Sequence, residues 1–258
     1  MTIAQRFRPA VAASLKHLLA SCVVALVCAT LVFGLWYPYP YSELVGGREL
    51  FLLVVSADVV SGPLLTLVVF NPRKPRTELM RDIGIVVVLQ LAALAYGLHS
   101  VAEARPVFLA FEGDRFRAVM VPDIDVADIL DAPQHLRDLS LRGPRLIGVR
   151  LAKPTDPDYP SSIQAALNGN PPAFRPGRWV DFEGQRADVI AAVKPLTALR
   201  TKHPHSQQRI DEAVKAAGVT EQRVGFLPFV AGSHSDWIVL VGLDDAKPKG
   251  FLPLDGFD

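Results

Sequence analysis

Two segments near the C-terminus hold residue types that could do chemistry. Ser233-His234-Ser235-Asp236 contains the three groups of a hydrolytic triad, but triads are assembled in space and not by adjacency, so we interpret it as a turn between two strands. His203-Pro204-His205 could supply two metal ligands, but its proline is typical of a turn and no carboxylate stands nearby. Glycine-rich phosphate-binding motifs on a strand–helix turn are also missing from the sequence. The sequence therefore predicts no enzyme activity, metal site or cofactor.

Asp58 is an ionisable residue of another kind, because it lies inside an apolar run. A carboxylate in the bilayer costs about 2.5–3.5 kcal/mol on insertion scales, so it is expected to face protein or water. Ser61, Gly62 and Thr66 follow at helical spacing and share one face with Asp58. Small and hydroxyl residues on one face predict a helix-packing seam. We take Asp58, Ser61, Gly62 and Thr66 as candidate partner-binding residues.

Two interpretations of Asp58 stay open. In the first, the carboxyl is protonated or bonded within the protein and only holds its helices together. Residues at a similar depth in neighbouring apolar runs would then be its partners: Cys28, Thr30, Gln90 and Tyr96. In the second, it contacts a helix of another membrane protein, as intramembrane ionisable residues often do.

Three apolar runs must position these residues. They cover about 15–36, 50–70 and 83–101, each near the ~20 residues that a helix needs to cross ~30 Å of hydrocarbon. Both cysteines, Cys22 and Cys28, lie in the first run. The sequence predicts a transmembrane region over residues 1–104 and a soluble domain over residues 105–258.

Charge indicates the orientation. The whole chain has 27 Lys and Arg against 26 Asp and Glu, which argues against a nucleic-acid binder. The first loop between spans carries only Arg48, whereas the other flanks are cationic and are expected to stay in the cytoplasm. The cationic residues of these flanks are Arg6, Arg8, Lys16, Arg73, Lys74, Arg76 and Arg81. We predict an inner-membrane protein with a cytoplasmic N-terminus and a periplasmic C-terminal domain.

Strand and helix signals mix without strict alternation after residue 105, which favours an α+β domain. Strands are expected at about 107–111, 116–121, 145–151, 223–230, 237–243 and 251–254. Helices are expected at about 126–131, 161–167, 185–193 and 207–217. The predicted class is thus a membrane protein with three N-terminal transmembrane helices followed by an α+β soluble domain.

Several ordered segments together resemble the TfpX/TfpZ family of type IV pilin accessory proteins. They are WYP at 36–38, DVVSGPLLTL at 58–67, QLAALAYG at 90–97, RPV at 105–107, DRF at 114–116, LRGPR at 141–145, GFLP at 225–228 and GFLPLD at 250–255. The stretch from about 153 to 224 matches least. The resemblance runs through most of the chain and brings no catalytic motif with it.

The resemblance implies an inner-membrane accessory of type IV pilus biogenesis that stabilises or assembles a particular major pilin. Its partners would be that pilin and membrane lipid, with other pilus assembly components as further candidates and without nucleic acid. The alternative is a membrane-anchored sensor or transport accessory, which an apolar pocket with convergent polar groups in the outer domain would favour. A membrane-bound hydrolase is a third class, and it would need His234 in a pocket beside a carboxylate.

Overall fold

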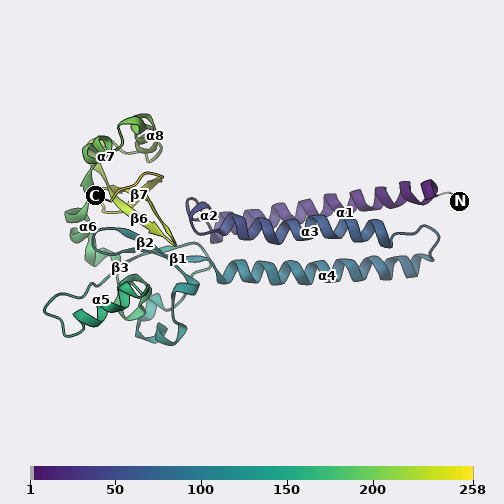
Figure 1. Ribbon diagram of the computed structural model, residues 1–258, viewed down its shortest axis with the longest axis horizontal. Helices are drawn as coiled ribbons and strands as arrows, with labels where there is room; N and C mark the ends of the chain where they lie inside the picture. Colours follow the sequence, from purple (N-terminus) through teal and green to yellow (C-terminus); the bar gives the residue numbers. More distant parts are fainter. Residues whose placement is uncertain (1–2, 258) are drawn as a thin grey trace. The chain divides into compact units, whose positions relative to one another are not determined.

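The computed structural model describes residues 3–257, with side chains from residue 7 onward. These residues form two compact units, Met1–Arg105 and Pro106–Asp258, each described here by itself. Three long helices make up most of the first unit: α1 (Ile3–Leu31), α3 (Gly47–Val69) and α4 (Arg76–Glu103) (Figure 1). Within the described chain, three helical stretches are long and apolar enough to cross a membrane: Phe7–Trp36, Gly47–Val69 and Arg76–Glu103.

Short connections join the three helices. A single π-helical turn, Val32–Trp36, extends α1, and the short helix α2 (Tyr41–Leu44) follows it. Tyr37 lies buried between these two elements, and its hydroxyl donates a hydrogen bond of 3.0 Å to the Val101 carbonyl near the end of α4. This bond ties the α1–α3 connection to the last turns of α4.

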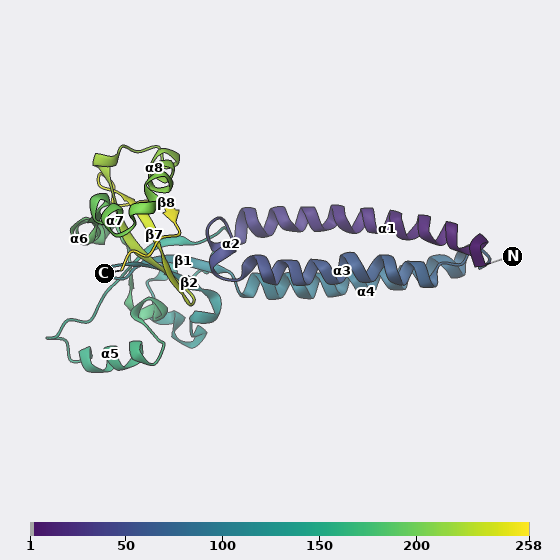
Figure 2. The same cartoon turned by 45° about the horizontal axis from the view of Figure 1, so that its top comes forward.

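Helix α3 is the central helix of this unit. It packs along α1 on one side and along α4 on the other, whereas α1 and α4 make no comparable contact in residues 3–257. Figures 1 and 2 show the three long helices running side by side. Because α1 and α4 do not pack against each other within these residues, one side of α3 is left uncovered between them.

The second unit is built on a mixed sheet. Within the described residues it has eight strands, in the order β4-β3-β1-β2-β6-β7-β8, with β5 paired to β6 beside β2. The strands are β1 (Pro106–Phe111), β2 (Phe116–Met120), β3 (Arg145–Val149), β4 (Trp179–Val180), β5 (Lys194–Pro195), β6 (Val224–Ala231), β7 (His234–Gly242) and β8 (Pro248–Leu252). Pairs β1–β3 and β2–β6 are parallel, and the other pairs are antiparallel.

Helices cover this sheet on its two halves. They are α5 (Tyr159–Leu167), α6 (Arg186–Ala192), α7 (Leu196–Lys202) and α8 (Gln207–Ala216). One core gathers around Phe108 and Trp179 and the other around Leu199, Ile210 and Leu240. Every residue of β1 and β6 is buried, as expected for strands covered on both faces. The three apolar helices and this sheet domain confirm the predicted fold class.

A buried ion pair joins the first hairpin to the loop after α5. Glu112 is only 7% exposed, and its carboxylate accepts hydrogen bonds from Arg117 Nε at 2.7 Å and from the Ala173 amide at 3.1 Å. The Arg117 guanidinium also lies over the ring of Phe174, 5.8 Å from its centroid. Because both carboxylate oxygens are bonded, Glu112 holds the 172–174 turn against the sheet.

Candidate intramembrane groove

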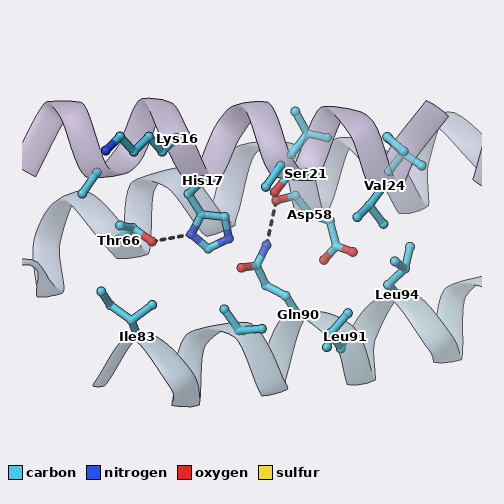
Figure 3. A pocket seen from close by; sticks show the side chains of 16 residues that line it. Lys16, His17, Ser21, Val24, Asp58, Thr66, Ile83, Gln90, Leu91 and Leu94 are labelled. Atoms are coloured by element: carbon cyan, nitrogen blue, oxygen red, sulfur yellow. Dashed lines mark hydrogen bonds between the residues drawn. The ribbon is translucent and has the colours of Figure 1, made fainter. Parts of the chain in front are cut away.

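A groove of about 420 Å³ runs between α1 and α4, and α3 forms its floor (Figure 3). The α1 wall repeats at helical spacing and consists of Ala13, Lys16, His17, Ala20, Ser21, Val24 and Ala25. The α4 wall consists of Ile83, Val87, Gln90, Leu91 and Leu94. The floor consists of Val55, Asp58, Val59 and Thr66.

The length of the groove follows from its walls. From Ala13 to Ala25 the α1 wall extends about 18 Å, and from Ile83 to Leu94 the α4 wall extends about 16 Å, at 1.5 Å per residue. This is more than half of the ~30 Å hydrocarbon layer. Ser21 and Ala25 stand four residues apart on the α1 wall, a small-residue spacing that permits close approach of another helix.

At one end of the groove, two hydrogen bonds join α1 to α3. The Ser14 hydroxyl donates to the carbonyl of Pro63 at 2.8 Å, and His17 Nδ1 shares a hydrogen bond of 2.5 Å with the Thr66 hydroxyl. His17 was missed by the sequence reasoning, although an ionisable residue near the start of an apolar run was a usable signal.

A level of polar side chains crosses the middle of the groove. Asp58 is the central residue of the 23-residue α3, and Gln90 lies at the middle of the 28-residue α4. Gln90 Nε2 donates to the backbone carbonyl of Asp58 at 3.1 Å, and Ser21 reaches the same level from α1. In Figure 3 the Asp58 carboxylate and the Gln90 amide both point into the space between the helices. Gln90 is thus a neighbour of Asp58, but it bonds the backbone and not the carboxylate.

The predicted face of α3 is divided by the structure. Asp58 and Thr66 line the groove, whereas Gly62 is buried under α4 and Ser61 is exposed away from the groove. A Cβ on Gly62 would lie 2.1 Å from Gln90 Nε2, so the glycine is what lets the Gln90 amide reach across to α3. Of the other residues considered as internal partners of Asp58, the buried Cys28 lies near enough to interact with it electrostatically. The Thr30 hydroxyl instead bonds the carbonyl of Leu26 in its own helix, and Tyr96 is 75% exposed.

The histidines of the second unit occupy surface positions. His234 and Asp236 are exposed at the start of β7, 3.6 Å apart, and Gly232 and Ser233 make the hairpin turn before them. His203 Nε2 lies 2.8 Å from the carbonyl oxygen of Asp255. Across residues 3–257, no group of three or more His, Cys, Asp or Glu side chains is arranged to hold a metal ion.

A hollow of about 260 Å³ in the second unit is lined largely by charged and polar side chains, among them Asp123, Asp125 and Arg175. Its carboxylates serve local turns: Asp123 accepts from the Met120 amide and Asp125 from the Ala127 amide, each at 2.9 Å. Burial raises the pKa of Asp123 and lowers that of Arg175. The hollow therefore lacks the apolar character that would favour a small-ligand sensor.

Comparisons with known proteins agree on one family. A family model described as fimbrial assembly protein FimB matches residues 5–46, which include the whole α1 wall of the groove. The serogroup E1 fimbrial assembly protein of Dichelobacter nodosus is 34% identical over 238 residues, 92% of each chain. The serogroup I protein of the same organism is 33% identical over 238 residues, again 92% of each chain. No solved structure matches the chain.

Fold and groove define a membrane protein whose long apolar helices leave a groove between α1 and α4. The chain belongs to the fimbrial assembly protein family, since its relatives match it over nearly their whole length. This membership supports a role in pilus assembly.

Proposed function

We propose that this protein is an inner-membrane accessory of type IV pilus biogenesis that holds the transmembrane helix of a particular major pilin. The observation that carries the proposal is the groove between α1 and α4, long enough for several turns of a helix and open along one side of α3. The family relationship supports pilus assembly as the process in which the protein acts. The resemblance to TfpX/TfpZ accessory proteins supports a pilin as the occupant.

The residues we assign to partner binding are Asp58, Ser61, Gly62 and Thr66, in different roles. Asp58 and Thr66 lie on the floor of the groove and would face the bound helix. Gly62 acts through Gln90, because its lack of a side chain admits the Gln90 amide. Ser61 is exposed outside the groove, where a second helix could approach.

We further propose that the N-terminus is cytoplasmic and that the sheet domain is periplasmic, on the strength of the cationic flanks. Alkaline phosphatase fused after Phe257 should be active, and the same enzyme fused after Arg76 should be inactive. The reverse pattern would refute this orientation.

The role we propose is not catalytic. Replacement of His203, His205 or His234 singly by Ala should leave piliation unchanged, because His234 and its neighbour Asp236 are both exposed and His203 bonds a backbone carbonyl. Loss of piliation at a normal protein level in any of the three variants would contradict a purely accessory role.

Photocrosslinking in cells tests the groove directly. A photoreactive phenylalanine in place of Leu91, which lines the groove, should capture the major pilin. The matched control is the same substitution at Leu89, which is similarly exposed (62% against 56%) but lies outside the groove lining. Equal capture at both positions, or no pilin at Leu91, would refute the proposed binding site.

A further inference from the structure

The polar level at the middle of the groove holds groups that lack hydrogen-bond partners within the described residues. Gln90 Oε1 is buried and makes no hydrogen bond in the described part of the chain. Its orientation is set, because the other end of the same amide donates to the Asp58 carbonyl. Within residues 3–257, neither the Asp58 carboxylate nor the Ser21 hydroxyl has a hydrogen bond or an ion pair.

The nearest cationic side chains do not meet this need. His17 is engaged with Thr66, and both lie toward the end of the groove. Lys16 lies on the α1 wall five residues before Ser21, about 7 Å along the helix axis from the polar level. A long lysine side chain near a helix end extends toward the membrane interface rather than the centre. Neither cation bonds the Asp58 carboxylate, which leaves it free to accept a hydrogen bond from a molecule in the groove.

We propose that Asp58, with Ser21 beside it and with Gln90 anchoring its backbone carbonyl, selects an occupant helix that carries a hydrogen-bond donor side chain near its midpoint. Unpaired acceptors in hydrocarbon are costly, so an occupant that supplies a hydroxyl, amide or ammonium donor there is favoured over one that is apolar throughout. The apolar walls above and below bind any transmembrane helix of suitable width. Selection between partners thus rests on this one level.

The shape of the groove favours a helix over a lipid chain. Its two walls are parallel helices, its α1 wall carries small residues, and its polar groups lie about 16 Å from either end of α3. Lipid head groups reside at the interfaces, so their donors do not reach that depth. The inference rests on the proposed function, because the pilin helix is the occupant in which the donor is sought.

The test measures crosslinking from the Leu91 probe to pilin in cell membranes. Asp58→Leu and Gln90→Leu should each lower the yield about three- to fifteen-fold, the range for hydrogen bonds between membrane helices. Ser56→Leu, at an exposed position of α3 outside the groove lining, is the matched control and should leave the yield within twofold. The donor residue is then identified on the captured pilin segment and replaced by Leu. Combining this replacement with Asp58→Leu should lower the crosslinking yield no further than Asp58→Leu does alone.

The outcomes separate the two proposals. Pilin captured equally with and without Asp58 and Gln90 would overturn the donor selection and leave the proposed function standing. Additive effects on the crosslinking yield, when Asp58→Leu is combined with the donor replacement, would also overturn the donor selection. Capture of a second copy of this chain, or lipid without pilin, would overturn both. Gln90→Leu could disturb the packing against Gly62, so the melting temperature of this variant in detergent is measured alongside. If that melting temperature falls, the proposal is judged from Asp58→Leu alone.

Discussion

Gly62→Ala should destabilise the helical unit, although alanine is the better helix former. The new Cβ would lie 2.1 Å from Gln90 Nε2 and 2.6 Å from its Cδ and Oε1, so the amide must move. That movement breaks its 3.1 Å hydrogen bond to the Asp58 carbonyl. Overpacking costs ~1–3 kcal/mol and the lost bond is part of it, while alanine recovers up to ~1 kcal/mol of helix propensity. We expect a net loss of about 1–2 kcal/mol in the free energy of unfolding.

The assay is reversible unfolding of the full-length protein in mixed detergent micelles, followed by helix content. Gly84→Ala is the matched control, because nothing lies within 4 Å of its added Cβ in α4, and it should be neutral or stabilising. The double variant Gly62→Ala with Gln90→Ala removes the obstructing amide and should recover part of the loss. Unchanged stability of Gly62→Ala, or strictly additive effects in the double variant, would refute the close Gly62–Gln90 contact.

Two further predictions concern the sheet domain. Glu112→Ala should lower its free energy of unfolding by about 3 kcal/mol, because Arg117 and the Ala173 amide lose a buried partner; Glu112→Gln should lose less, since it still accepts from the amide. Protease resistance of the domain is the readout, and equal behaviour of both variants would contradict the ion pair. Asp123→Asn should stabilise the domain at neutral pH, because burial raises the pKa of Asp123 above its ordinary 3.8. The native state therefore holds this proton more tightly than the unfolded state, and the stability of the domain falls as pH rises from 3.8 through the folded pKa. The advantage of Asn over Asp should accordingly vanish in thermal melts at low pH. An advantage that persists at low pH would contradict the raised pKa of Asp123.

Local sequence patterns were enough to predict much of the fold. The apolar runs predicted the three long helices, since crossing hydrocarbon demands about 20 apolar residues in a row. The Gly-Asp turn predicted the β1–β2 hairpin, and Gly218, with φ of +67°, marks the stop after α8. Strands β4 and β5 escaped prediction, because two-residue strands depend on pairing with β3 and β6 and leave no periodic signal.

The amino-acid sequence alone placed a carboxylate, a glycine and hydroxyl residues on one face of a membrane helix. Helical periodicity was enough for that, because it depends only on spacing within one segment. Which of these residues face a groove, and which are covered by Gln90, depends on the register and rotation of α4 and α1 against α3. Helix register in a bilayer is decided by close packing between side chains distant in sequence, and lipid supplies no hydrophobic force that a pattern could reveal. Only the tertiary structure therefore brought Ser21, Asp58 and Gln90 to one level, where all three line the groove between α1 and α4.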